Sequence, residues 1–296
     1  MHARYGCSIF PQLDLSPHLL ILIVTFMSRV FPADSSVVAE VWPSPNHGER
    51  KGGDRPDMIV LHYTGMPDAK AALGRLCTSG TEVSAHYFVF EDGRVIQLVQ
   101  ESRRAWHAGA AVWAGETDVN SLSVGIEIAN PGHDYDYPDF PRRQIAAVTA
   151  LCRGIQTRNS IPPLRVLAHS DVAPGRKQDP GEKFPWRTLY DSGVGHWVEP
   201  APITEGGVLL ALGDRGDEVA AMQDLLGQYG YGVSVNGNYD SIMNDVVTAF
   251  QRHFRPARVD GITDQSTRAT LRELLATRGR VRTIAARARG SGRAAP

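Results

Sequence analysis

The chain has 296 residues, of which 42% are hydrophobic and 21% are charged, and its formal net charge is -1 at pH 7. This length accommodates one large domain or two modest ones, and the composition is that of an ordinary globular protein. A net charge near zero gives no general attraction for nucleic acid, so we expect no nucleic-acid partner. The three cysteines show no paired spacing, which argues against a disulfide framework and predicts that Cys77 and Cys152 are buried thiols.

Residues 1–35 form an N-terminal extension, and its sequence leaves two interpretations open. Residues 19–26 are strongly apolar, but a helix that crosses a bilayer needs about 20 apolar residues, so we expect no integral membrane segment. The run fits the core of a signal peptide, although little positive charge precedes it and no A-x-A site follows it. Alternatively, Met27 is the true start and residues 1–26 are a spurious extension.

Residues 36–197 then alternate between short apolar runs and amphipathic patterns. Five runs predict buried or half-buried strands, at residues 58–61, 83–90, 94–99, 123–130 and 164–167. Glu91, Asp92 and Gly93 predict a hairpin turn between the second and third of these. Amphipathic spacing predicts helices at residues 69–77 and 140–158. Because strands and helices mix without strict alternation, we expect an α/β domain with one mixed central sheet flanked by helices.

A second region follows residues 198–207, whose prolines and glycines are typical of a linker. Amphipathic patterns predict three helices, at residues 218–229, 241–254 and 265–276, and therefore a small all-α domain over 208–277. The stretches VNGNYDSIMNDVVTAF and VDGITDQSTRATL resemble each other and suggest a duplicated turn–helix unit. We expect the two domains to have separate cores, so that a chain cut after about residue 200 still folds.

Residues 278–296 form a basic C-terminal tail without acidic side chains. Its composition is typical of a disordered, solvated extension. Contact with an anionic polymer is the alternative interpretation.

The strongest chemical signal is the segment HSDVAPGRKQDPG, residues 169–181, which follows a predicted buried strand. Its prolines and glycines predict a shaped loop that is neither helix nor strand. His169 and Asp179 offer an imidazole nitrogen and a carboxylate oxygen, which are both good zinc ligands. His62 follows another buried strand and supplies a third ligand, although a histidine in that setting is often structural. Three protein ligands leave a position for water, which is the pattern of a catalytic zinc site.

Two further residues complete a hydrolytic constellation. Glu127 lies inside an apolar strand with Gly125 and Ala129 on its own face, and these small neighbours leave room for a reactive carboxylate. A buried salt bridge is the competing interpretation of Glu127. Lys177 stands two residues before Asp179 and can stabilise an oxyanion, unless it is a solvated surface lysine. His86 is expected to pack near the site, with metal ligation as the less favoured alternative.

Five motifs in this order resemble the zinc-dependent N-acetylmuramoyl-L-alanine amidases of the type-2 amidase family: LHYT, VSAHYFVFEDG, RAWHAG, VGIEIAN and AHSDVAPGRKQDPG. The resemblance covers about residues 40–195, and the C-terminal helices resemble a three-helix peptidoglycan-binding domain. It implies one zinc ion held by His62, His169 and Asp179, with Glu127 and Lys177 as catalytic residues. It also implies that Trp106 and His107 contact the substrate.

The resemblance implies hydrolysis of the amide bond between N-acetylmuramic acid and L-alanine in peptidoglycan or in anhydromuropeptides. Two alternatives are a non-catalytic peptidoglycan-binding protein and a zinc peptidase that acts on the stem peptide. We expect the protein to be a monomer. We also expect it in the cell envelope, that is, the periplasm, because a polymer-binding domain has little use in the cytoplasm. A cytoplasmic location follows if Met27 is the true start.

Overall fold

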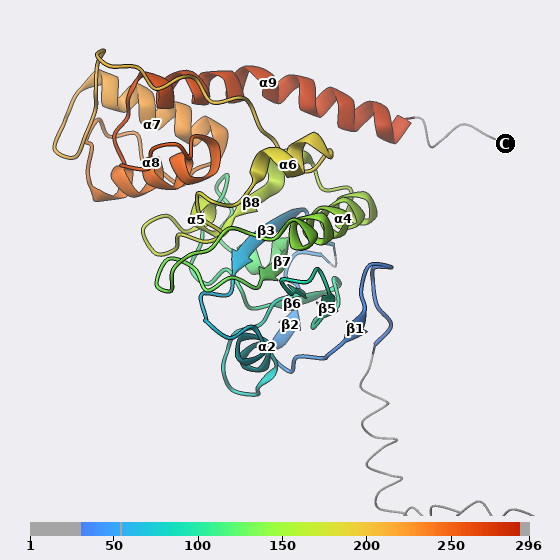
Figure 1. The fold of residues 1–296 in the computed structure, drawn as a ribbon. Coiled ribbons are helices and arrows are strands. Elements are labelled where there is room, and N and C mark those ends of the chain that lie inside the picture. Colours follow the sequence, from blue (N-terminus) through green and yellow to red (C-terminus); the bar gives the residue numbers. More distant parts are fainter. Residues whose placement is uncertain (1–30, 54, 291–296) are drawn as a thin grey trace, which may run out of the picture.

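The computed structural model describes residues 31–53 and 55–290, so the apolar segment 19–26 and Met27 lie outside the described residues (Figure 1). Its main element is a six-stranded sheet in the order β1-β5-β4-β7-β3-β8. Neighbouring strands are parallel except for the antiparallel hairpin of β4 and β5, so the predicted mixed sheet is confirmed. The strands are β1 (Glu40–Val41), β3 (Met58–Tyr63), β4 (Tyr87–Val89), β5 (Val95–Gln97), β7 (Ser123–Ile128) and β8 (Val166–Ala168).

A second, two-stranded sheet pairs β2 (His47–Glu49) with β6 (Arg103–Ala105) in antiparallel register. Three strands were missed in the sequence, because β1, β2 and β6 are short and carry no apolar run. In the other direction, the predicted strand over 83–90 was too long, since β4 begins only after His86.

Helices α2 (Ala69–Cys77) and α4 (Arg142–Asn159) cover opposite faces of the main sheet (Figure 1). Successive side chains of a strand point to opposite faces, and the neighbours Tyr87 and Phe88 show this in β4. Phe88 belongs to the apolar cluster of α2, whereas Tyr87 belongs to the cluster of α4. The face under α2 carries the site described below.

The segment after β8 begins with one turn of helix, α5 (His169–Val172), so the prediction of a loop was wrong for these four residues. The turn forms because the Asp171 carboxylate accepts a hydrogen bond from the backbone N–H of Ala168 at 2.8 Å. The first proline, Pro174, comes only after this turn has ended. Short helices α3 (Val119–Leu122) and α6 (Trp186–Asp191) complete this part of the chain.

The C-terminal region contains the three expected helices, α7 (Asp217–Tyr229), α8 (Ser241–Phe254) and α9 (Gln265–Gly290). Helix α9 continues beyond residue 277, where we expected a disordered tail. The tail consists largely of arginine and alanine, which are strong helix formers, and this explains the continuation. Within the described residues, no helix is long and apolar enough to cross a membrane.

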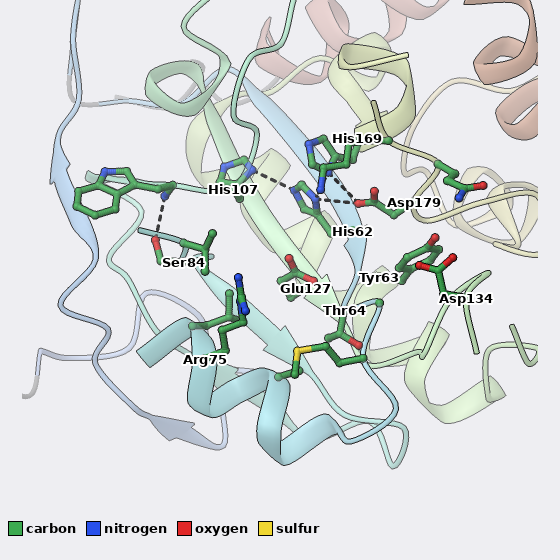
Figure 2. A pocket seen from close by; sticks show the side chains of 18 of the residues that line it. His62, Tyr63, Thr64, Arg75, Ser84, His107, Glu127, Asp134, His169 and Asp179 are labelled. Carbon is green, nitrogen blue, oxygen red and sulfur yellow. Dashed lines mark hydrogen bonds and ion pairs between the residues drawn. The ribbon is translucent and has the colours of Figure 1, made fainter. Parts of the chain in front are cut away.

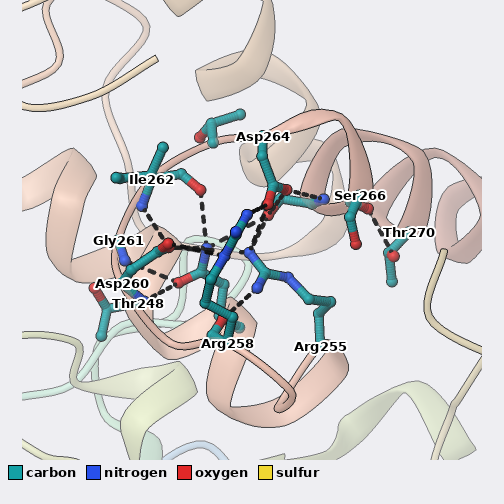
Figure 3. A network of polar contacts seen from close by, with 12 residues as sticks. Thr248, Arg255, Arg258, Asp260, Gly261, Ile262, Asp264, Ser266 and Thr270 are labelled. Carbon is teal, nitrogen blue, oxygen red and sulfur yellow. Dashed lines mark hydrogen bonds and ion pairs between the residues drawn. The ribbon is translucent and has the colours of Figure 1, made fainter. Parts of the chain in front are cut away.

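Two equivalent turns explain the internal sequence repeat. The buried Gln223 of α7 accepts the backbone N–H groups of Asn236 and Gly237 at 3.0 and 2.9 Å. One repeat later, Gln251 of α8 accepts those of Asp260 and Gly261, both at 2.9 Å. Figure 3 shows the second turn, where Asp264 also binds Arg255 and Arg258. The duplicated turn–helix unit suggested by the sequence is therefore present.

The two regions share one hydrophobic core, so the expectation of separate cores was wrong. Trp113 of the sheet region packs edge-on against Tyr231, with ring centroids 5.0 Å apart. Trp186 stacks on His253 of α8 with centroids 3.7 Å apart. The sequence around Trp113 and Tyr231 does not predict this contact, because neither residue belongs to an apolar pattern of a helix or a strand. Of the two thiols expected to be buried, Cys152 is buried and Cys77 is partly exposed.

Candidate active site

Three potential ligand atoms meet at the carboxyl ends of β3 and β8 (Figure 2). His62 belongs to β3, His169 begins α5, and Asp179 lies in the loop that follows. The two Nδ1 atoms are 2.9 Å apart, and Asp179 Oδ2 lies 3.1 Å from that of His62 and 2.9 Å from that of His169. All three residues are buried. The structure thus brings the predicted ligands together.

In His169, the ring nitrogen that faces away from the other two ligand atoms is a hydrogen-bond donor. Its Nε2 lies 3.1 Å from the backbone carbonyl oxygen of Ala108. A carbonyl oxygen can only accept a hydrogen bond, so Nε2 carries the hydrogen. In the neutral imidazole Nδ1 then has no hydrogen, and its lone pair points at the other two ligand atoms.

A chain of hydrogen bonds fixes His62 in the same way. The Ser123 hydroxyl donates to the carbonyl of Val119, so it must accept from His107 Nε2 at 3.2 Å. His107 Nδ1 therefore has no hydrogen and accepts from His62 Nε2 at 3.0 Å. His62 Nδ1 is left with a bare lone pair. Burial, followed by the charge of His169, lowers the pKa of His62 to about 4, which keeps the ring neutral.

This arrangement fits a metal ion. Two bare imidazole nitrogens and a carboxylate oxygen face one another without a hydrogen between them, which is repulsive unless a cation lies among them. Each histidine also donates its outer N–H to an acceptor, as metal-bound histidines usually do. Among the described residues, His62, His169 and Asp179 are the group of histidine, cysteine and acidic side chains that could hold a metal.

Glu127 stands beside this group, on β7, where it is the register partner of His62. Its Oε2 atom is buried and has no hydrogen-bond partner among the residues that the structure describes. Burial and, second, the charge of Asp179 raise the pKa of Glu127 well above its usual value, while Lys177 opposes the shift. Among the described residues Glu127 therefore forms no salt bridge, which was the competing interpretation of this residue.

The small neighbours of Glu127 have a different function from the one expected. A Cβ atom on Gly125 would lie 2.4 Å from the ring of His107, so the space above Gly125 is filled by that imidazole. Ala129 belongs to the apolar cluster under α2. The room near Glu127 is thus occupied by His107.

A cleft of about 550 Å³ opens over these residues. Glu127, Lys177 and Trp106 line it together with the three ligands, and α2 contributes Arg75 to its wall. Trp106 is partly exposed, and its backbone N–H donates to Ser84 Oγ at 2.9 Å. His107 also lines the cleft, but both of its ring nitrogens are engaged by His62 and Ser123.

Several residues of the site were not singled out in the sequence. Tyr63 lines the cleft, and its hydroxyl lies 2.9 Å from His133 Nδ1. The Arg176 guanidinium donates to the carbonyls of Ala108 and Ala110, which holds the loop that orients His169. Tyr63 could have been identified from its position next to His62. The role of the Ala108 carbonyl could not, because every residue type supplies the same backbone carbonyl.

His86 is not a member of the ligand group. Its Nδ1 accepts the backbone N–H of Gly125 at 3.0 Å, and its ring centroid lies 5.8 Å from that of His107. The favoured prediction of a packed residue near the site is therefore confirmed.

Two family profiles match the chain. A profile of N-acetylmuramoyl-L-alanine amidases matches residues 52–182, and one of a peptidoglycan binding domain matches residues 215–271. The first match contains every ligand-bearing segment described above, and the second spans α7 and α8 and the start of α9.

Relatives with this architecture are known from bacteria. N-acetylmuramoyl-L-alanine amidase AmiD of Escherichia coli K12 is 35% identical over 237 residues, which are 75% of this chain and 83% of AmiD. The solved complex of E. coli AmiD with the substrate anhydro-N-acetylmuramic acid-L-Ala-D-gamma-Glu-L-Lys superposes with a TM-score of 0.66 at 33% identity. It covers 79% of this chain and 98% of that one.

AmpDh3 of Pseudomonas aeruginosa, solved in complex with an anhydromuramic pentapeptide, gives a TM-score of 0.61 at 32% identity. This match covers 75% of the present chain and 92% of AmpDh3. The amidase profile ends at residue 182, whereas the two superpositions cover 79% and 75% of the 296 residues. Both superpositions therefore extend past that profile into the helical region. Fold, ligand cluster and relatives agree, and the chain belongs to the N-acetylmuramoyl-L-alanine amidase family.

Proposed function

We propose that this amidase hydrolyses the bond between the lactyl group of N-acetylmuramic acid and L-alanine, with one zinc ion held by His62, His169 and Asp179. The observation that carries the proposal is the pair of bare Nδ1 atoms facing the Asp179 carboxylate. Beside them lies Glu127 Oε2, which has no hydrogen-bond partner in the described part of the chain. A zinc ion in such a site acts as a Lewis acid and provides a water-derived nucleophile near neutral pH.

The residues of the chain supply proton transfer and charge stabilisation. Glu127 accepts the proton of the attacking water and delivers it to the leaving amine nitrogen of L-alanine. Its pKa is raised, first by burial, which is the direction expected of a group that must take up a proton during the reaction. Lys177 faces the cleft and stabilises the negative charge that develops on the lactyl carbonyl oxygen.

Trp106 and the wall of the cleft bind the substrate. A partly exposed indole beside a cleft presents an apolar face to a sugar ring or to the alanine methyl group. The relatives solved with an anhydromuramic tripeptide and pentapeptide support ligands of this class.

Mass spectrometry of digested peptidoglycan tests the activity. The amidase must release peptides that begin with a free L-alanine and leave glycan strands without peptide. A binding protein would release nothing, and a peptidase would leave L-alanine attached to muramic acid. Metal analysis tests the site: the wild-type chain should bind one zinc ion, and His169→Ala should lose it. Full zinc occupancy in His169→Ala would refute the proposed ligand set.

We infer further that the enzyme acts in the cell envelope. The match of residues 215–271 to a peptidoglycan binding domain supports this, since attachment to the polymer raises the effective concentration of the cleavable bonds. Fractionation of cells that produce the full chain would locate it, and recovery with cytoplasmic markers alone would refute the inference. That the protein is a monomer stays a prediction.

A further inference from the structure

The buried carboxylate of Asp171 connects the helical region to the turn that carries His169, one of the proposed zinc ligands. This residue stands two positions after His169 in the single turn of α5. Its Oδ1 accepts the Tyr231 hydroxyl at 2.6 Å, and its Oδ2 accepts His253 Nδ1 at 2.6 Å. Oδ2 also accepts the backbone N–H of Ala168 at 2.8 Å, which closes the turn. Asp171 is completely buried, so these donors replace the water that a carboxylate would otherwise bind.

Both donors from the helical region are themselves held firmly. The His253 ring lies against Trp186, with ring centroids 3.7 Å apart and planes inclined by 22°. The Tyr231 ring packs edge-on against Trp113. Because these aromatic contacts fix both rings, the two hydrogen bonds hold Asp171 in one position.

Helix α8 also touches the rest of the ligand-bearing loop, and Figure 1 shows it next to α5. A Cβ atom on Gly175 would lie 2.3 Å from the Asp245 carboxylate, so the loop backbone is pressed against the helix there. Arg252 donates to the side chain of Gln178 at 3.3 Å. Gln178 stands between Lys177 and Asp179, so α8 contacts the loop on both sides of Lys177.

The turn that carries His169 needs such support. It has four residues, and its end is closed by one hydrogen bond, from Ala173 N–H to the His169 carbonyl at 3.0 Å. A single helical turn is unstable by itself, because one hydrogen bond does not compensate for fixing several backbone angles. The orientation of His169 therefore depends on what holds the turn from outside.

We propose that Tyr231 and His253 are positioning residues of the metal centre: through Asp171 they fix the turn that carries His169. The helical region is then part of the catalytic machinery, in addition to any contact that it makes with the polymer. This inference rests on the proposed zinc site. Residues that orient metal ligands typically contribute 10–100-fold to metal affinity or activity, and we expect a loss in that range.

The test compares two conservative substitutions in the full chain. Tyr231→Phe removes only the hydroxyl that binds Asp171. Tyr239→Phe is the matched control, because this buried hydroxyl donates to the Gly261 carbonyl at 2.6 Å, within the helical region and away from the loop. Zinc affinity is measured by competition with a chelator, and thermal melting reports the stability of each variant.

We expect Tyr231→Phe to bind zinc about 10–100-fold more weakly and to show a lower kcat with little change in KM. Tyr239→Phe should match the wild type in zinc affinity at a comparable loss of stability. His253→Phe, which keeps the stacked ring, should repeat the Tyr231→Phe result, and should it fail to fold, Tyr231→Phe decides alone.

Wild-type zinc affinity in a folded Tyr231→Phe chain would overturn the inference and leave the proposed function intact. An equal loss of affinity in Tyr239→Phe would overturn it as well, since the effect would then be one of general stability. A wild-type chain that binds no zinc would overturn the proposed metal centre and this inference together.

Discussion

His62 and Glu127 are register partners on the parallel strands β3 and β7, so a proposed metal ligand and the proposed proton carrier leave the same face of the sheet side by side. Gly125, two residues before Glu127, makes room on this face for His107, which orients His62. A slip of one residue in this pairing would turn Glu127 to the other face. The register of two strands thus assembles the reactive groups.

Glu127→Gln should lower kcat by about 10²–10⁴-fold, the usual contribution of general acid–base catalysis. Glutamine has the same size but cannot take up the proton of water. Zinc content and melting temperature should stay close to those of the wild type, because Glu127 is not one of the proposed ligands and its buried Oε2 accepts no hydrogen bond from any residue that the structure describes. Turnover and melting are measured on the same preparation. An active but destabilised variant would show that Glu127 has a structural role.

His107→Phe should weaken zinc binding by about 10–100-fold, since a phenyl ring fills the space above Gly125 but cannot accept the hydrogen bond of His62. Chelator competition measures this affinity. Trp106→Ala is the companion variant, because Trp106 lines the cleft and its backbone N–H binds Ser84 rather than one of the proposed ligands. It should raise KM and leave zinc affinity unchanged. If His107→Phe kept its zinc and raised only KM, His107 would be a substrate contact alone.

Much of the fold could be predicted from local patterns. The bounds of α2 and α8 agree with their apolar periodicity, because a helix that buries one face must repeat every three or four residues. The short β2, with the sequence HGE, could not be predicted, because its pairing with β6 rather than its own composition makes it a strand.

The residue types of the site could be predicted from the sequence, but the hydrogen bonds that connect these residues could not. His62, His169 and Asp179 stand in recognisable motifs, and the fold brings them together as expected. The role of His107 depends on which of its nitrogens carries a hydrogen, and Ser123 decides this from a distant part of the chain. The bond between Asp171 and Tyr231 joins two regions that look independent in the sequence. Such tertiary contacts have no local pattern.

A chain cut after residue 200 should be less stable than the full chain, because the two regions share one core. The cut removes the aromatic residues that cover Trp113 and Trp186, which are now 2% and 4% exposed. Exposing a large apolar side chain costs about 1.5–3 kcal/mol, and Asp171 would lose two hydrogen bonds as well. Thermal melting compares this chain with one cut after residue 280, which keeps all of these contacts. Equal melting temperatures for the two would show that the regions fold independently.

His196 should make the stability of the protein depend on pH. It is buried between the regions, with Nδ1 at 2.9 Å from the Tyr229 hydroxyl and Nε2 at 3.0 Å from Thr277 Oγ1. Burial, then the charges of His253 and Arg278, lower the pKa of His196 to about 4. In the unfolded chain the pKa of histidine is about 6.5, so between these values the unfolded chain binds more protons.

The free energy of unfolding should therefore fall as the pH drops from about 6.5 toward 4, and the contribution of His196 should be fully present above that window. Because one pKa unit corresponds to about 1.4 kcal/mol, the loss from His196 is on the order of 2–3 kcal/mol. His196→Gln keeps a polar side chain that does not titrate, so its stability should decline less steeply. Urea unfolding of both proteins at pH 7 and pH 4.5 measures the difference, in which the other histidines cancel. Parallel declines would show that His196 stays neutral in the unfolded chain as well, or is protonated in the folded protein, and either result would contradict the prediction.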